Sequence, residues 1–315
     1  MKPALRTAVI LVVLALTVAA SCVSPWPSNP KGRVAAAYEI LGSRGCDHPR
    51  ADAEPAAGTT KNNTLAEQSG SYSLTVPHSY RSGHPMPLIL LFYGFASDPS
   101  QFSALTGLPA RASRHGYVVA VPHAQGDEWQ FSGDGTDAAF VSAMVAHLES
   151  TYCINTKRVF ATGFSAGAAF TIFYACDHQG SIAAIATVAV EFQLGCTRPL
   201  SIMAFHGTKD PLVPYQNGAV GLSLPGVKVR GTQRNMSDWA RLDHCRSHPR
   251  MKRIGSQVDR KWWTGCTGGT SVVLYSVLGG GHSWPGADPK KSIGLTTQQI
   301  NATNQILGFF DRSPS

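Results

Sequence analysis

Short hydrophobic runs alternate with polar and glycine-rich stretches along most of the chain. Four runs have the length and composition of buried strands, and one of them leads almost directly into an apolar segment that suits a helix. Strands that alternate with helices favour a mostly parallel central sheet with helices on both faces. We therefore predict a single α/β domain over residues 36–312. The strand candidates are 87–92, 158–162, 200–205 and 271–278, and the helix candidate is 168–176.

The most informative motif lies between the strand 158–162 and the helix 168–176. The sequence Gly163-Phe164-Ser165-Ala166-Gly167 fits G-x-S-x-G, the nucleophile elbow of α/β hydrolases, which requires a strand, a tight turn and a helix. The turn exposes the Ser165 hydroxyl and directs the N-terminus of the helix at the site, where it stabilises a developing oxyanion. We predict an α/β-hydrolase fold with Ser165 as the nucleophile.

An α/β hydrolase carries its acid and its histidine after the serine, in that order. Asp210 follows the strand 200–205 on a loop, and His282 follows the run 271–278 on a glycine-rich loop that is expected to let the imidazole swing over the serine. In this prediction Ser165 attacks an ester carbonyl, His282 takes and returns the proton, and Asp210 fixes the tautomer and supports the imidazolium.

Each assignment has a structural alternative. Most aspartates after strands form turns or cap helices, and Asp210 precedes Pro211. Asp243 is a second candidate for the acid, but no strand precedes it. His206 and His244 fit surface or hydrogen-bonded structural roles better than catalysis. Three matching positions in the expected order favour the triad.

An oxyanion hole needs a second backbone N–H, from the loop after an early strand. The run 87–92 is that strand, so we assign the two donors to the N–H groups of Ala166 and Phe95. Tyr93, Trp129 and Trp284 are candidates for the wall of a substrate pocket. The alternative for the tryptophans is core packing, because their rings bury much apolar area.

The N-terminus has the pattern of an export signal. Lys2 and Arg6 precede an uncharged apolar stretch that is too short for a comfortable membrane span, so residues 1–21 are predicted to be a signal peptide. The small residues before Cys22 resemble the bacterial lipobox, in which the cysteine is lipidated.

Two features near this cysteine qualify and extend the prediction. Ala19 stands where leucine is commoner in a lipobox, which leaves ordinary cleavage near Ala20 or Ser21 as the alternative. Three prolines in the polar run after Cys22 indicate an extended tether, so residues 22–35 would hold the domain off a membrane surface.

The chain has seven cysteines, and setting Cys22 aside leaves an even number. An even set in an exported chain suggests disulfides, of which six cysteines allow fifteen connectivities. The alternative is that one or two are free buried thiols. Neither C-x-x-C nor H-E-x-x-H occurs, so we predict no metal site and no cofactor.

The formal net charge is +8, and the basic residues concentrate between Lys228 and Lys261. A solvated face is the simpler interpretation, and contact with an anionic cell-envelope polymer or lipid headgroups is the alternative. Nucleic acid is disfavoured, because the chain is predicted to be exported and no basic stretch is interleaved with stacking aromatic residues.

The chain resembles the secreted esterases that include feruloyl esterases and polyhydroxybutyrate-depolymerase-like proteins. The resemblance runs from about Gly45 to Phe310, and its final motif is far rarer than the elbow. Its pieces are Ser73–Pro77, Leu91–Phe95, Arg158–Gly167, His206–Asp210 and Gly279-Gly280-Gly281-His282-Ser283-Trp284-Pro285-Gly286.

The resemblance places the triad of this family on Ser165, Asp210 and His282. With the spacing along the chain, it also implies the disulfides Cys46–Cys153, Cys176–Cys196 and Cys245–Cys266. The family usually has His-Gly at the oxyanion loop, where this chain has Tyr93 before Gly94. A backbone donor survives that change, but substrate range or rate could differ.

The main functional prediction is an exported, monomeric serine carboxylesterase. Its substrates would be feruloyl- or acetyl-type polysaccharide esters or polyhydroxyalkanoate-like esters, including polymeric ones, and a lipid on Cys22 would anchor it to the membrane. An acyltransferase to a sugar or lipid acceptor shares the same acyl-enzyme, so the sequence does not separate the two. A catalytically degenerate surface lipoprotein is supported only by Tyr93. A peptidase is a lesser alternative, because nothing in the sequence resembles the extra domain or charged pocket that peptidases on this fold often use to choose their substrate.

Overall fold

The computed structural model describes residues 42–47, 60–65, 70–126, 128–131, 135–193, 195–220 and 228–313 of the chain. All of them belong to one compact unit, Leu41–Ser315. The predicted signal peptide, Cys22 and the tether lie outside the described residues. Among the helices of the described ranges, none is long and apolar enough to cross a bilayer.

A ten-stranded mixed sheet forms the centre of this unit, in the order β1-β2-β4-β3-β5-β6-β7-β12-β11-β10. The six strands from β4 to β12 in that order run parallel, and an antiparallel pair extends the sheet on each side. The predicted mostly parallel sheet is therefore confirmed. The strands are β1 (Thr60–Leu65), β2 (Gly70–Thr75), β3 (Met86–Phe92), β4 (Val118–Pro122), β5 (Ile154–Phe164), β6 (Ala184–Val188), β7 (Ser201–Gly207), β10 (Arg250–Ile254), β11 (Val258–Trp262) and β12 (Val272–Val277).

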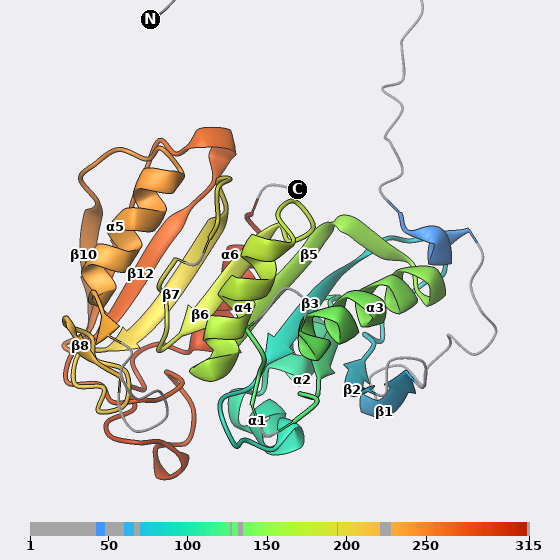
Figure 1. The fold of residues 1–315 in the computed structure, drawn as a ribbon, viewed down its shortest axis with the longest axis horizontal. Coiled ribbons are helices and arrows are strands. Elements are labelled where there is room, and N and C mark those ends of the chain that lie inside the picture. The colour runs from blue at the N-terminus through green and yellow to red at the C-terminus, as the bar shows by residue number, and fades with distance from the viewer. Residues whose placement is uncertain are drawn as a thin grey trace, which may run out of the picture. The chain divides into compact units, whose positions relative to one another are not determined.

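Helices cover both faces of the sheet, as predicted. In Figure 1, α3, α4 and α5 lie on the face turned to the viewer, while α2 and α6 pack together on the other face. The helices are α1 (Pro99–Thr106), α2 (Leu108–Arg114), α3 (Thr136–Thr151), α4 (Ala166–Asp177), α5 (Thr232–Leu242) and α6 (Ala302–Phe310). Short elements complete the fold: η1 (Arg44–Cys46), η4 (Thr267–Gly269), η5 (Pro289–Lys291) and a small ribbon of β8 (Gly218–Ala219) with β9 (Lys228–Val229).

The four predicted strands correspond to β3, β5, β7 and β12, and the predicted helix is α4. Only β5 differs much, because it begins at Ile154 rather than at 158. Every residue of β6 and β7 is buried, as expected for central strands of a parallel sheet covered on both faces.

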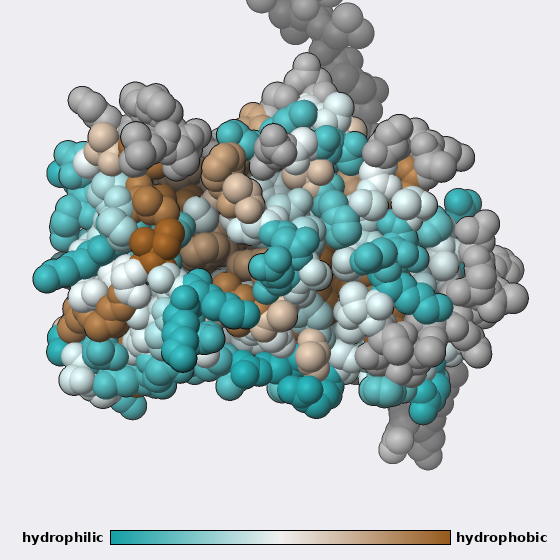
Figure 2. All heavy atoms as spheres, turned by 90° about the horizontal axis from the view of Figure 1, so that it is seen from below, coloured by the Kyte–Doolittle hydropathy of each residue, from teal (hydrophilic) through white to brown (hydrophobic). Residues whose placement is uncertain are grey.

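The carboxyl ends of the parallel strands meet at one edge of the sheet, the lower edge in Figure 1. The loops after β3, β5, β7 and β12 therefore lie close together, which is where an open α/β sheet carries its site. Figure 2 looks onto this edge and shows hydrophobic residues, in brown, gathered around a hollowed region.

Three disulfides are present in the pairing that the resemblance implies. Cys46–Cys153 joins η1 to the start of β5, and Cys176–Cys196 joins the end of α4 to the loop after β6. Cys245–Cys266 closes the segment that carries β10 and β11.

The basic segment between Lys228 and Lys261 includes β10, the edge strand at one side of the sheet. Four of the five residues of β10 are exposed, and the Arg253 guanidinium pairs with Asp259 on β11. Charged residues on an exposed edge strand discourage pairing with other chains, which agrees with the interpretation of a solvated face.

Candidate active site

Ser165 occupies the turn between β5 and α4 with φ 54° and ψ −122°, a conformation that non-glycine residues rarely adopt. The flanking glycines explain how the turn is held. A Cβ on Gly163 would overlap the carbonyl of Gly167, and a Cβ on Gly167 would overlap the carbonyls of Phe92 and Tyr93. The start of α4 thus packs directly on the ends of β5 and β3, and this packing keeps Ser165 in its strained conformation.

Asp210 and His282 form a buried carboxylate–histidine pair. Asp210 Oδ2 lies 2.8 Å from His282 Nδ1, and the side chains are 0% and 4% exposed. The second carboxylate oxygen accepts the N–H groups of Leu212 and Val213, each at 2.9 Å. Because an ionised carboxylate can only accept, Nδ1 carries the hydrogen and Nε2 is left free to accept a proton.

Glycines also bring the two loops of this pair together. A Cβ on Gly207 would overlap the carbonyls of Gly280 and Gly281, and a Cβ on Gly281 would overlap the carbonyl of Ile293. The N–H of Lys209 donates to the carbonyl of Gly280 at 2.9 Å. These glycines therefore provide close backbone packing, which fixes the distance between Asp210 and His282, rather than the freedom of movement that the sequence suggested.

The surroundings keep Asp210 ionised. Burial raises its pKa, but the hydrogen bond and charge of His282, the N–H of Val213 and the nearby His206 outweigh burial, so the pKa lies below its ordinary value. The carboxylate is therefore available to orient and support His282 across the neutral range.

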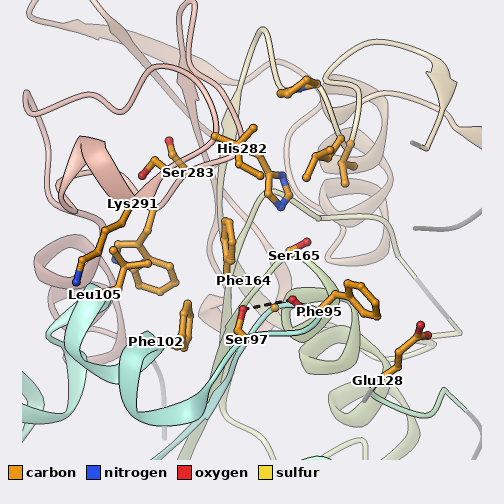
Figure 3. Close-up of a pocket in the computed structure, with 17 residues that line it drawn as sticks. Phe95, Ser97, Phe102, Leu105, Glu128, Phe164, Ser165, His282, Ser283 and Lys291 are labelled. Atoms are coloured by element: carbon orange, nitrogen blue, oxygen red, sulfur yellow. Dashed lines mark hydrogen bonds between the residues drawn. The ribbon is translucent and has the colours of Figure 1, made fainter. Parts of the chain in front are cut away.

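Ser165 and His282 line one open cleft of about 780 Å³. Figure 3 shows them facing each other near its middle, with Phe102, Leu105 and Lys291 on one side and Phe95 and Glu128 on the other. The imidazole of His282 packs on Phe164, with ring centroids 4.7 Å apart, so the variable residue of the elbow supports the histidine.

A second, smaller cavity of about 70 Å³ also reaches Ser165. It lies on the Ala166 side, and His282 is not among the residues that line it. Its walls are mostly apolar and include Trp129, Phe131, Ala169, Val190 and Phe192. Ser165 therefore stands where a large cleft with several polar residues meets a small apolar cavity.

Ala166 and Phe95 lie where oxyanion donors are expected. Ala166 is the first residue of α4, so its N–H has no acceptor within the helix. The backbone of Gly94 runs beside the elbow, because a Cβ there would be 3.4 Å from the Cβ of Ser165. Phe95 follows directly and lines both cavities.

The three pocket candidates have different positions. Trp284 lines the cleft and Trp129 lines the smaller cavity, although both side chains are almost fully buried. Tyr93 lines neither cavity; its hydroxyl accepts the N–H of Ala124 at 2.8 Å, and its carbonyl accepts the indole N–H of Trp129 at 2.8 Å. Tyr93 thus joins the loop after β3 to the loop after β4.

The alternative acid lies at the other end of the sheet. The carboxylate of Asp243 accepts the N–H of Leu200, just before β7 begins, whereas Asp210 follows the end of β7. His244 is exposed in a turn, and His206 is buried and hydrogen-bonded, as the sequence suggested. The partner of His206 is Glu191, which the sequence reasoning missed; its place three residues after β6, at the same edge of the sheet, is the only signal that pointed to it.

The fold is that of an α/β hydrolase. No protein-family model matches the chain. It is 26% identical to "Feruloyl esterase B" of Piromyces equi over 66% of this chain and 41% of that protein, so it spans less than half of that relative's length. It is 23% identical to "Putative esterase NocK" of Nocardia uniformis over 96% of this chain and 97% of the relative.

A solved structure gives the same fold. The acetyl xylan esterase from Aspergillus awamori matches with a TM-score of 0.58 and 15% identity, over 81% of this chain and 99% of that one. The resemblance to feruloyl-esterase-type proteins and the α/β-hydrolase fold are thus confirmed. Within the described ranges, no group of three or more His, Cys, Asp or Glu side chains is arranged to hold a metal ion.

Proposed function

We propose that this protein is an exported serine carboxylesterase that works through a Ser165–His282–Asp210 triad and an acyl-enzyme. The observation that carries the proposal is the 2.8 Å Asp210–His282 pair, whose histidine lines the same cleft as the strained Ser165. Relatives named as esterases support the reaction class. Export is supported by the three disulfides, which persist in oxidising compartments.

In this mechanism the Ser165 hydroxyl attacks the ester carbonyl while His282 Nε2 takes its proton. The N–H groups of Ala166 and Phe95 stabilise the oxyanion. His282 then returns the proton to the leaving alcohol, the ester C–O bond breaks, and the acyl group stays on Ser165. Water, activated by His282, hydrolyses the acyl-enzyme and regenerates the serine.

The proton transfer from His282 to the leaving alcohol indicates which part of the ester each cavity binds. The leaving alcohol must contact His282, so it occupies the large cleft, whose size suits a sugar or a polymer fragment. The acyl group lies on the other side of Ser165, in the apolar cavity. That cavity, at about 70 Å³, is well below the roughly 150 Å³ that accommodates benzene, so we expect short acyl groups to be preferred over feruloyl groups.

The test is hydrolysis of a panel of esters by the oxidised domain: p-nitrophenyl acetate, butyrate and octanoate, and methyl ferulate. Ser165→Ala should abolish the activity while thermal unfolding stays unchanged, and Ser150→Ala, at an exposed serine on α3 outside both cavities, is the matched control. Activity retained in Ser165→Ala would refute the triad. Methyl ferulate as the best substrate would refute only the acyl-size assignment.

The identity of the natural ester and the membrane anchor are predictions that need their own tests. The choice among acetyl-, feruloyl- and polyhydroxyalkanoate-type esters is tested by the same panel extended to polymers. Lipidation of Cys22, which lies outside the described residues, is tested by mass spectrometry of the mature N-terminus after expression in a bacterial host.

A further inference from the structure

A second buried carboxylate–histidine pair, Glu191–His206, lies next to the Asp210–His282 pair. His206 Nδ1 is 2.6 Å from Glu191 Oε2, and the side chains are 1% and 3% exposed. His206 is on β7 and Glu191 follows β6, so both belong to the same edge of the sheet as Ser165. Neither residue lines the cleft or the smaller cavity.

Both ring nitrogens of His206 face acceptors. Nε2 is 2.9 Å from the carbonyl of Val213, which can only accept, so Nε2 carries a hydrogen. Nδ1 faces the Glu191 carboxylate, with the Thr232 hydroxyl 3.0 Å away. Burial lowers the pKa of His206, but the charge and hydrogen bond of Glu191 outweigh it and raise the pKa above its ordinary value. The hydrogen-bond geometry and the neighbouring charge of Glu191 both indicate that His206 is a positively charged imidazolium.

Helix α5 holds Glu191 in place. The Asn235 side-chain amide donates to Glu191 Oε1 at 2.9 Å, and the Trp239 indole donates to the Glu191 backbone carbonyl at 2.8 Å. All three side chains are buried. The ion pair is therefore a rigid, fully hydrogen-bonded unit and not a pair of side chains that can separate.

Val213 connects this unit to the triad. Its carbonyl accepts from His206, and its N–H donates to Asp210 Oδ1. His206 Nε2 also lies 3.6 Å from Asp210 Oδ2, the oxygen bonded to His282. Pro211, Leu212 and Val213 line the cleft, so the same short loop holds the catalytic acid and forms part of the substrate wall.

We propose that the Glu191–His206 ion pair is a positioning unit for the triad. It holds the loop 210–213 in the shape that aims Asp210 at His282, and it places a positive charge behind the Asp210 carboxylate. His206 contacts neither the reacting atoms nor the cleft, so it acts through Asp210. The inference rests on the proposed function of the triad.

Few ionisable groups lie near His206 among the described residues. They are Glu191 after β6, Asp210 after β7, and Tyr215, whose ring centroid is 5.6 Å from that of His206; His282, on the loop after β12, lies beyond Asp210. Helix α5 contributes only the neutral Thr232 to the ring. Removing the Glu191 charge is therefore the most direct way to remove the positive charge from His206.

The experiment compares Glu191→Gln with wild type in kcat and KM across pH, together with thermal unfolding. Glu191→Gln keeps a hydrogen-bonding partner for His206 but leaves the buried imidazole neutral. We expect kcat to fall about tenfold with little change in KM. We also expect the acidic midpoint of the kcat/KM profile, set by the Asp210–His282 pair, to move up by about half a pH unit or more.

Two further substitutions separate the charge from the loop contact. In His206→Gln, the amide nitrogen can still donate to Val213, whereas in His206→Asn it can reach only towards Glu191. We expect kcat to fall further in His206→Asn than in His206→Gln. Glu149→Gln, at a partly buried carboxylate on α3 outside both cavities, is the control and should change neither parameter.

A fluorophosphonate probe gives a readout that needs no ester substrate, because its rate of reaction reports the nucleophilicity of Ser165 at each pH. If wild type reacts and folded Glu191→Gln or His206→Gln has an unchanged kcat and pH profile, the pair is only structural and the inference is overturned. If Glu191→Gln does not fold, His206→Gln decides on the same criterion. If wild type neither hydrolyses esters nor reacts with the probe, the proposed function fails first.

Discussion

Two carboxylate–histidine pairs lie side by side at the carboxyl edge of the sheet, and they differ in what the second ring nitrogen meets. In Glu191–His206, that nitrogen donates to the carbonyl of Val213 inside the protein. In Asp210–His282, the histidine lines the cleft that also contains Ser165. Pairs with almost the same chemistry are thus a closed structural unit in one case and a candidate proton carrier in the other.

The difference teaches that a buried histidine next to a carboxylate is not by itself a catalytic signal. A histidine whose two nitrogens both face acceptors keeps its protons, whereas one with a free nitrogen at a cavity can exchange a proton with a substrate. The substitutions below test whether activity depends mainly on Asp210–His282 and stability mainly on Glu191–His206, whose effect on activity is expected to be indirect and smaller.

The largest effect is expected from Asp210→Asn. The amide would donate to His282 Nδ1 and force the ring hydrogen onto Nε2, so His282 could no longer accept the proton of Ser165. We expect kcat to fall about 10⁴-fold with the fold intact, as in serine hydrolases that lose the triad acid. The measurement is steady-state hydrolysis of p-nitrophenyl acetate.

Glu191→Gln is the matched comparison, because it makes the same chemical change in the neighbouring pair, where a loss of only about tenfold is expected. A loss in Glu191→Gln as large as that in Asp210→Asn would contradict the division of roles. A loss below tenfold in Asp210→Asn would contradict the assignment of Asp210 as the triad acid.

The sequence predicted the Asp210–His282 pair at the cleft better than the enclosed Glu191–His206 pair, for a physical reason. Ser165, Asp210 and His282 each follow a strongly hydrophobic strand, and parallel strands bring their carboxyl ends together. The sequence motifs around Asp210 and His282 also include Gly207 and Gly281. Only the structure shows that a larger residue would not fit at these positions, because the two loop backbones touch there.

Glu191 and Tyr93 show where sequence reasoning stops. The interaction of Glu191 depends on β6, β7 and α5 meeting in space, and no local pattern records such a meeting. The sequence places Tyr93 at the pocket because it stands beside Gly94, yet its hydroxyl accepts the N–H of Ala124 on another loop. Side-chain direction after a strand end is set by the tertiary neighbours, which sequence spacing does not give.

The second prediction concerns stability, for which the larger loss is expected from the Glu191–His206 pair rather than from Asp210–His282. Glu191→Ala leaves His206 buried without its counter-charge, and breaking a buried ion pair in this way costs about 3–5 kcal/mol. Asp210→Ala should cost less, because His282 already borders the cleft, where water can hydrate its ring nitrogens. Urea unfolding with the disulfides intact measures both. Equal losses in the two variants would show that both pairs support the fold alike.

The third prediction concerns pH. A raised pKa at His206 stabilises the folded protein below the ordinary value of 6.5, and this contribution is lost as pH rises through the folded pKa. A lowered pKa at Asp210 contributes above the ordinary value of 3.8 and is lost as pH falls through the folded pKa. The melting temperature should therefore be highest in the mildly acidic range.

Glu191→Gln should remove the alkaline part of this profile. Above the ordinary His pKa of 6.5, its melting temperature should fall less with rising pH than that of wild type, because His206 no longer loses a proton there. Thermal unfolding at a series of pH values measures this. Parallel curves for the two proteins would mean that His206 is neutral in the folded state throughout.

The smallest effect concerns a further buried carboxylate, Asp243, for which no hydrogen bond to a histidine is found among the described residues. Asp243 accepts the N–H of Leu200 through Oδ1, while its Oδ2 has no partner within hydrogen-bonding distance among the described residues, although Thr270 and His244 lie near the carboxylate. Burial raises the pKa of Asp243, so its ionised form costs stability at neutral pH. Asp243→Asn should therefore stabilise the protein by about 1 kcal/mol, measured by urea unfolding at pH 7. Asp177→Asn, at an exposed position, should have no effect; a destabilised Asp243→Asn would mean that the charge itself is needed there, as it is at Asp210.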